Sequence, residues 1–323
     1  MDDNESKARA VFFGTPEFAV PCLAALCDVA RVTLVVSQPD RRAGRGMRMT
    51  PPPVKAAALA RGLEVIQPAK VRVPAFAERI AAERADVAVV VAYGRILPGA
   101  VLAAPRLGCV NVHASLLPEL RGAAPIQWAV IRGFSRTGVC LMQMEADLDS
   151  GPVLARRTVD IGAEESAGEL SVRLSTLGAE LVRAELPRYL AGRLTAEVQE
   201  HARATLAPIL RKEDGRVDWT RRASEIHDLV RGTQPWPGAW CLLGDVRVKL
   251  HRTRVLATEG VRAAPGTIVA LGATEDAKDR RAIEIACGTG VLGVVELQAE
   301  GARRMNAAEF IAGRRISAGM RLG

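Results

Sequence analysis

The segment from Asp86 to Ala92 contains six consecutive apolar residues, four of them valine. The β-branched valines favour a strand, and the segment is far shorter than the roughly 20 apolar residues of a membrane-spanning helix. A strand without a polar face is buried on both sides, as at the centre of a parallel sheet that carries helices on both faces. The segment therefore predicts an α/β fold built around a parallel sheet.

The sequence on either side alternates between short β-branched runs and helical patterns. We expect further strands at residues 10–13, 32–37, 64–66, 109–113 and 137–145. This alternation is typical of a doubly wound, Rossmann-like domain, which we place at residues 1–200. Gly14 follows the first strand without the G-x-G-x-x-G pattern of dinucleotide-binding turns, so we expect no nicotinamide cofactor.

The C-terminal third has a different pattern. Residues 201–215 are polar and weakly periodic, and we interpret them as a linker. Residues 216–323 contain five short strand patterns, at 239–243, 246–255, 266–271, 282–286 and 290–297, with one helical pattern before them and one after. Short strands separated by turns favour a small OB-like β-barrel as the second domain.

Positive charge is concentrated in this C-terminal part. Residues 201–323 carry 20 Lys and Arg against 14 Asp and Glu, a net charge of +6 out of +8 for the whole chain. A basic domain favours an anionic partner such as nucleic acid. A general preference for arginine over lysine in this chain would explain the ratio of the two basic residues. It would not explain why basic residues outnumber acidic ones.

Other features argue against secretion, membrane insertion and metal binding. The first residues, MDDNESK, are polar and acidic with no apolar run behind them, so we expect no secretory signal, no membrane anchor and a soluble, cytoplasmic protein. The six cysteines form no C-x-x-C pair and the four histidines no H-x-x-x-H pair. We therefore expect neither a disulfide framework nor a metal site.

Polar side chains gather near the predicted strand 109–113. Its two-residue period puts Asn111 and His113 on one face, and Asp147 and Asp149 lie in a turn after the next strand, at what we expect to be the corresponding end of the sheet. An amide can hydrogen-bond an oxyanion, a neutral imidazole can accept a proton, and a carboxylate can orient that imidazole. A hydrogen-bonded structural histidine and a turn-forming aspartate are the alternative interpretation.

Longer motifs include these residues: NVHASLLP at 111–118, RGAAPIQW at 121–128, MQM at 142–144 and LDSG at 148–151. Together they resemble the signature of the folate-dependent formyltransferases. Further motifs are similar to the members that formylate methionyl-initiator tRNA, and they extend the resemblance over essentially the whole chain. They are FFGTPEFAVPCL near the start, QPDR at 38–41, GRG at 44–46, Asp218-Trp219, QPWP at 234–237 and PGTI at 265–268.

The resemblance implies formyl transfer from 10-formyltetrahydrofolate, as a co-substrate, to the α-amino group of methionyl-initiator tRNA. His113 would help to remove the amine proton, Asn111 would polarise the formyl oxygen and Asp149, rather than Asp147, would hold His113. No G-x-S-x-G motif surrounds Ser115, so direct attack by the amine is favoured over a covalent intermediate. The residues implied to bind folate are Ser115, Leu116, Leu117 and Pro118 and, on a weaker match, Gly94, Arg95, Ile96 and Leu97.

The segment 38–53 is rich in arginine and glycine, and we expect it to form a mobile cationic loop. Charged runs usually form solvated loops, but long loops inside compact domains are commonly functional. The resemblance implies that this loop contacts tRNA through Arg41, Arg42, Arg45 and Arg48. In the second domain, Trp236 and Trp240 could form a stacking platform, although we expect them to pack against the end of the barrel.

Two other functions fit parts of the sequence. A formyltransferase of the same chemistry could act on a small amine, such as glycinamide ribonucleotide or an amino sugar, or on water, but would not be expected to need the cationic loop or the basic domain. A non-catalytic RNA-binding protein would not be expected to keep Asn111, His113 and Asp149 together. Nothing in the sequence demands more than a monomer.

Overall fold

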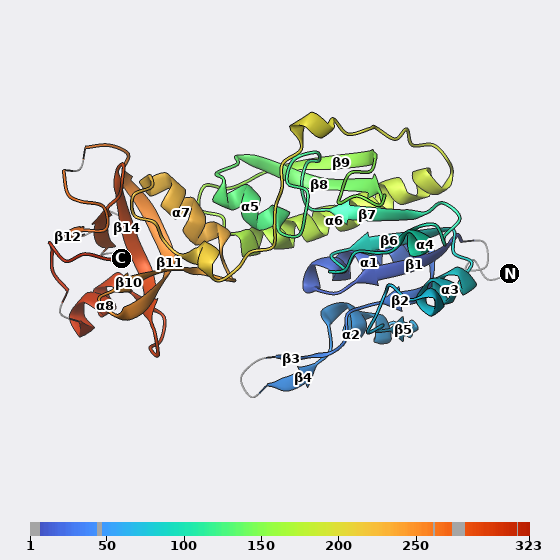
Figure 1. The fold of residues 1–323 in the computed structure, drawn as a ribbon, viewed down its shortest axis with the longest axis horizontal. Helices are drawn as coiled ribbons and strands as arrows, with labels where there is room; N and C mark the ends of the chain where they lie inside the picture. The colour runs from blue at the N-terminus through green and yellow to red at the C-terminus, as the bar shows by residue number, and fades with distance from the viewer. Residues whose placement is uncertain (1–6, 44–46, 261, 273–281, 315) are drawn as a thin grey trace. The chain divides into compact units, whose positions relative to one another are not determined.

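The computed structural model describes residues 7–43, 47–260, 262–272, 282–314 and 316–323 (Figure 1). Two compact units make up the chain. The first contains residues 1–125, 136–160 and 171–208, and the second contains residues 126–135, 161–170 and 209–323. Among the described residues, no helix is both long enough and apolar enough to cross a membrane.

A seven-stranded sheet forms the centre of the first unit, in the order β5-β2-β1-β6-β7-β8-β9. The strands from β5 to β7 pair in parallel, whereas β8 and β9 pair antiparallel at one edge. All five residues of β6 are buried, which confirms the parallel sheet predicted from this segment. The bounds are β1 (Arg9–Gly14), β2 (Arg31–Val36), β5 (Val65–Ile66), β6 (Val87–Val91), β7 (Cys109–His113), β8 (Arg136–Gln143) and β9 (Val153–Asp160).

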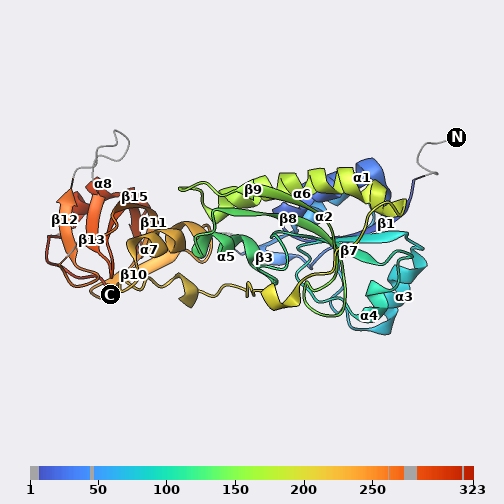
Figure 2. The same ribbon diagram turned by 90° about the horizontal axis from the view of Figure 1, so that it is seen from above.

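Helices cover both faces of this sheet, as the doubly wound fold requires (Figure 2). On one face, Gly178 of α6 (Ala167–Leu190) packs against Val112 of β7 and against Cys22 of α1 (Val20–Val29). Side chains alternate along a strand, so the neighbours of Val112 point to the opposite face. That face packs against Phe76 and Ile80 of α3 (Pro74–Ala82) and against Val101 of α4 (Gly99–Leu102). The remaining helices before α6 are η1 (Glu17–Ala19), α2 (Pro53–Leu59) and α5 (Pro125–Ile131).

A two-stranded antiparallel hairpin, β3 (Arg41–Ala43) and β4 (Arg48–Thr50), extends from the first unit. We expected an irregular loop here, and that expectation was wrong for these two strands. The hairpin base is tied down because Lys55 Nζ lies 2.8 Å from the carboxylate of Asp40, which also accepts a hydrogen bond from Gln67. The hydrogen bond from Lys55 is the main reason why the pKa of Asp40 is lowered.

After α6 the chain runs back along the first unit through residues 197–207, which we call the return segment. The Val153 N–H donates to the Glu197 carbonyl, and the Arg121 N–H donates to the Thr205 carbonyl, both at 2.8 Å. The return segment includes the one-turn helix η2 (His201–Arg203). The first part of the predicted linker 201–215 therefore hydrogen-bonds within the first unit, and the second unit resumes at residue 209.

The second unit contains an antiparallel sheet in the order β10-β11-β14-β13-β12, with β15 paired to β14. The last residues of the sequence connect its two edges, because Leu322 pairs with Leu243 and Arg321 pairs with Thr267. Ile285, Leu292 and Phe310 pack inside. The elements are η3 (Glu213–Gly215), α7 (Ala223–Gly232), β10 (Ala239–Leu243), β11 (Val246–Ala257), β12 (Ile268–Gly272), β13 (Ala282–Ala286), β14 (Val291–Ala299), β15 (Met305–Asn306) and α8 (Ala307–Gly313).

Candidate active site

Asn111 and His113 lie on one face of β7, opposite the face on which Val112 packs against α6. His113 is only 5% exposed, while Asn111 is half-buried. Their cross-strand neighbours on β8 are Met142 and Cys140, which are both buried. An imidazole and an amide therefore share one largely desolvated surface at the end of a central strand.

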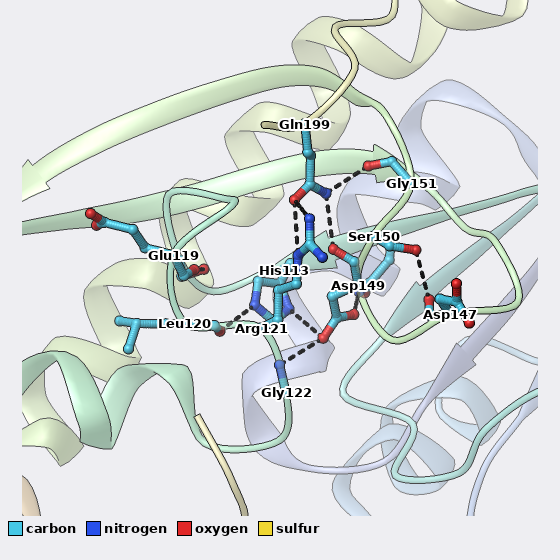
Figure 3. A network of polar contacts seen from close by, with 12 residues as sticks. His113, Glu119, Leu120, Arg121, Gly122, Asp147, Asp149, Ser150, Gly151 and Gln199 are labelled. Atoms are coloured by element: carbon cyan, nitrogen blue, oxygen red, sulfur yellow. Dashed lines mark hydrogen bonds and ion pairs between the residues drawn. The ribbon is translucent and has the colours of Figure 1, made fainter. Parts of the chain in front are cut away.

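Both ring nitrogens of His113 face an acceptor (Figure 3). Nε2 lies 3.0 Å from the carbonyl oxygen of Leu120, and Nδ1 lies 3.6 Å from Oδ2 of Asp149. A carbonyl oxygen can only accept a hydrogen bond, so the first contact keeps a proton on Nε2. The lone pair of the neutral ring is then on Nδ1, on the side of the Asp149 carboxylate.

Asp149 connects three parts of the site. Its Oδ1 lies 3.4 Å from Asn111 Nδ2, its Oδ2 accepts the backbone N–H of Gly122 at 2.8 Å, and the same Oδ2 faces His113. The other candidate, Asp147, is exposed, and its backbone carbonyl accepts from the Ser150 hydroxyl. The geometry therefore groups Asp149, and not Asp147, with Asn111 and His113.

The route by which Asp149 reaches His113 differs from the one expected. Because β8 is antiparallel to β7, with Gln143 beside Val110, the loop after β8 begins at the opposite end of β7 from His113. We expected the end of β8 to lie at the same edge of the sheet as the end of β7, and that expectation was wrong. The loop instead folds back over the sheet face, and Asp149 adopts a left-handed backbone conformation with φ +47°.

Sequence reasoning missed the backbone groups that complete the site, the Leu120 carbonyl and the Gly122 N–H. It also missed the side chains of Arg121 and Gln199. The Arg121 guanidinium donates to the Gln199 side chain, which in turn donates to the carbonyl of Asp149 (Figure 3). The glycine in the motif 121–128 was a usable signal, because Gly122 has φ +123° and a Cβ there would lie 2.7 Å from the Ala207 carbonyl oxygen. Gln199 gave no such signal, since it lies in a weakly periodic segment.

Neither possible nucleophile beside His113 is free to react. Ser115 is fully buried, and its hydroxyl donates to the Glu119 carbonyl at 2.6 Å. Cys140 pairs with His113 across the sheet, but burial raises the pKa of its thiol to about 11. A thiol with such a pKa is not a thiolate at neutral pH. The site therefore suits direct reaction between two bound molecules.

The residues predicted to bind folate differ in exposure. Ser115, Leu117 and Leu97 are buried, and Leu117 packs with Cys140 and Met142. Leu116, Pro118 and Arg95 are half-buried, while Gly94 and Ile96 are exposed. Of these residues, Arg95 and Ile96 line a cavity of about 400 Å³ whose other walls are Ala69, Lys70, Val71, Arg72 and Val73.

Three of the four arginines predicted to contact tRNA are exposed on the β3–β4 hairpin: Arg41, Arg42 and Arg48. In the described part of the chain, none of these three guanidinium groups contacts a carboxylate. Arg45, the fourth, lies outside the described residues.

A second cationic surface lies on β10 and β11 of the second unit. We call it the basic face, and it consists of Trp240 on β10, Arg247 and Lys249 on β11, and Arg216, which follows η3 and pairs with Trp240. The Arg247 guanidinium lies 3.6 Å from the centre of the Trp240 ring and that of Arg216 lies at 5.8 Å, while Lys249 pairs with Trp240 across the strands. The expectation that both tryptophans pack against the barrel end was wrong for Trp236, which is 51% exposed.

Within the described residues, no group of three or more His, Cys, Asp or Glu side chains could hold a metal ion.

Comparison with known proteins identifies the same two regions. The model of a family described as formyl transferase matches residues 8–186, and that of the formyl transferase C-terminal domain matches residues 209–315. Two similar proteins, both named methionyl-tRNA formyltransferase, come from Sorangium cellulosum and Myxococcus xanthus. They are 49% and 48% identical to this chain, and each alignment covers at least 97% of both sequences.

Among solved structures, HypX from Aquifex aeolicus in complex with tetrahydrofolic acid has a similar fold. The superposition has a TM-score of 0.59 and covers 95% of this chain and 47% of that longer one. The identity is 18%, so this likeness concerns the fold alone.

Proposed function

This chain belongs to the formyl transferase family, and on that premise we propose that it formylates methionyl-initiator tRNA. The formyl donor is 10-formyltetrahydrofolate, and the product is N-formylmethionyl-tRNA for translation initiation. The observation that carries the proposal is the convergence of Asn111, His113 and Asp149 on one half-buried surface.

The reaction forms a bond between the α-amino nitrogen of methionine and the formyl carbon, and breaks the bond from that carbon to N10 of the folate. One proton leaves the attacking amine, and one is delivered to N10. Nδ1 of His113 is the proton acceptor, because the Leu120 carbonyl holds the ring proton on Nε2. The Asp149 carboxylate, 3.6 Å from Nδ1, stabilises the imidazolium that results.

Asn111 polarises the formyl oxygen. An amide nitrogen carries two N–H groups, and the 3.4 Å contact with Asp149 occupies one of them. The second can donate to the oxygen as it gains negative charge, a contribution that is larger in a desolvated site than in water. Asp149 thus serves both partners, since it orients the amide and faces the imidazole.

The cavity beside Arg95 fits a folate in its charge and polarity. Folates carry an anionic glutamate tail and a flat ring system. The cavity presents Lys70, Arg72 and Arg95 as cations, and Ile96 as an exposed apolar side chain. Arg95 is held in place because it donates to Gln38 and to the Ala69 carbonyl.

The acceptor is a tRNA because exposed arginines with no carboxylate partner suit a phosphate backbone. Within the described residues, such arginines are Arg41, Arg42 and Arg48 of the β3–β4 hairpin, and we assign these three to tRNA. We assign Arg45 to tRNA as well, from the sequence motif alone. The basic face adds an aromatic ring on which a base can stack. A formyltransferase for a small amine has no use for either surface. We further propose that the protein acts as a monomer in the cytoplasm, where tRNA is charged.

The test is formyl transfer by the purified protein, with 10-formyltetrahydrofolate as donor and three separate acceptors: methionyl-initiator tRNA, glycinamide ribonucleotide and water. We expect N-formylmethionyl-tRNA and, at most, traces of the other products. Transfer to glycinamide ribonucleotide without transfer to charged tRNA would assign the small-amine function instead.

A further inference from the structure

Two loops surround His113, and each contains residues in the left-handed backbone region. Leu120, with φ +60°, and Gly122, with φ +123°, belong to the loop that follows β7, and Asp149, with φ +47°, belongs to the loop that follows β8. Non-glycine residues adopt such angles only when surrounding contacts hold them there. Within the described residues, the polar contacts of the His113 ring come from Leu120 and Asp149, so whatever holds the two loops also fixes the imidazole.

The side-chain amide of Gln199, in the return segment, joins the two loops (Figure 3). Its Nε2 donates to the Asp149 carbonyl at 2.9 Å and to the Gly151 carbonyl at 2.7 Å. Its Oε1 accepts two hydrogen bonds from the Arg121 guanidinium, at 3.1 and 2.7 Å. The amide thus uses both its donors and both its acceptor positions, which fixes its orientation, and it is only 5% exposed.

The return segment also holds the backbone of the first loop. The Leu120 N–H donates to the Thr205 hydroxyl at 2.9 Å, and the Arg121 N–H donates to the Thr205 carbonyl at 2.8 Å. The Ala207 N–H donates to the Arg121 carbonyl at 2.7 Å. Thr205 therefore fixes the residue whose carbonyl oxygen contacts Nε2 of His113.

We propose that Gln199, Arg121 and Thr205 are positioning residues that align Asp149 and Leu120 on the two nitrogens of His113. They contact neither substrate. They act by holding the loop of Leu120 and the loop of Asp149 in fixed positions relative to each other. This role rests on the proposed function, because it concerns the rate of formyl transfer. Side chains of this kind are needed since a displacement of about 1 Å of a catalytic group can cost about 100-fold in rate.

Two pairs of variants test the proposal. Gln199→Glu keeps the acceptors that face Arg121 but cannot donate to the carbonyls of Asp149 and Gly151, and Gln199→Leu loses both sets of contacts. Thr205→Val removes the hydroxyl that accepts from Leu120, and Thr205→Ser restores it. Val198→Ala is the matched control, because this neighbour in the return segment is 75% exposed.

We expect Gln199→Glu, Gln199→Leu and Thr205→Val to lower kcat by about 10- to 100-fold, with KM for tRNA and for the formyl donor unchanged. Thr205→Ser and Val198→Ala should keep the wild-type kcat. A wild-type kcat in Gln199→Glu and Thr205→Val, or a loss confined to KM, would overturn the proposal.

A second measurement does not depend on activity. In protein labelled with ¹⁵N-histidine, the ring signals of His113 are identified by their absence in His113→Ala. We expect Gln199→Glu to move these signals and Val198→Ala to leave them in place. Unchanged His113 signals in Gln199→Glu would overturn the positioning role even if the proposed function holds. If wild-type protein formylates nothing, the proposed function fails, and the signals still decide the positioning role.

Discussion

The polar groups around His113 and the arginines of the cationic surfaces differ in their exposure and in their partners. Around His113 the polar groups are buried or half-buried and contact one another, as in the contacts of Asp149 with Asn111 and Gly122. On the β3–β4 hairpin and the basic face, arginines are partly or fully exposed, and Arg41, Arg42 and Arg247 contact no carboxylate within the described residues. One region is preorganised internally, while the other is available to an external polyanion.

This difference separates the chemical step from the recognition of the acceptor. Groups in a desolvated site act on charge that develops during the reaction, and salt screens them weakly. Exposed arginines act on phosphates through long-range forces that salt weakens strongly. Changes near His113 should therefore alter kcat, and changes on the cationic surfaces should alter the KM for tRNA and its salt dependence.

The largest expected effect comes from Asp149→Asn. The variant keeps the shape of the side chain but removes the charge that faces Nδ1 of His113. We expect kcat to fall by about 1,000-fold, as the imidazolium loses its stabilising carboxylate. Single-turnover formylation at saturating substrates measures this. A kcat within threefold of wild type, about 0.7 kcal/mol in the barrier, would contradict the role of Asp149.

Asn111→Ala should have the next largest effect. Removing one donor from an oxyanion site typically costs about 100- to 1,000-fold in kcat, and we expect a loss of about 100-fold here. The KM for tRNA should not change, nor should its dependence on salt between 50 and 200 mM. An effect on KM alone would assign Asn111 to binding and would remove it from the chemical step.

Removing two hairpin charges together, Arg41→Ala with Arg42→Ala, should act on binding instead. We expect the KM for tRNA to rise about tenfold and the slope of log KM against log salt concentration to fall by about 2, one unit per lost phosphate contact. The control is Arg61→Ala, which removes one exposed arginine in the turn that follows α2. If the slope of log KM against log salt concentration were the same in the double variant and in the control, the assignment of the hairpin arginines to tRNA phosphates would be contradicted.

A smaller change should follow Trp240→Leu on the basic face. Loss of one stacking platform weakens nucleic-acid binding by about 1 kcal/mol at the lower end, which gives a rise of about fivefold in the KM for tRNA. Trp236→Leu is the control, since this tryptophan is more exposed than the half-buried Trp240 but has no arginine stacked on it in the described residues. A larger rise in the KM for tRNA in Trp236→Leu than in Trp240→Leu would show that tRNA contacts Trp236 rather than the basic face.

The smallest effect is expected from Asp40→Asn at the hairpin base, where the KM for tRNA should rise about twofold, because a half-buried ion pair near the surface contributes little. The hydrogen bond from Lys55 is the main cause of the lowered pKa of Asp40. A lowered pKa stabilises the folded state above the unfolded pKa of about 3.9, and this contribution is lost as the pH falls through the folded value.

The thermal midpoints of wild type and Asp40→Asn should therefore differ by a constant amount at pH 5 to 8 and converge towards pH 3. A difference that grows on acidification would contradict the assigned sign.

The sequence was most informative where local pattern decides structure. The valines of β6 have no polar alternation and occupy a central buried strand, and the two-residue period of β7 put Asn111 and His113 on one face. The strand ranges of the second unit were also close to those observed. Each of these predictions depends on periodicity within one element.

The sequence was least informative where chain segments meet. The antiparallel course of β8 and β9 and the fold-back of the Asp149 loop depend on pairing between distant residues. The contact between Gln199 and Arg121 joins positions 78 residues apart through one side chain. The hairpin was taken for a loop because three-residue strands carry too few side chains to show a period.

The central claim is that an imidazole held between Leu120 and Asp149 carries the formyl-transfer step. Its most direct test is the single-turnover rate of N-formylmethionyl-tRNA formation in wild type and in His113→Ala, with both substrates saturating and the binding of each measured separately. We predict that the variant binds both substrates as wild type does and reacts at least about 1,000-fold more slowly. A His113→Ala protein that formylates charged tRNA at the wild-type rate would contradict the account.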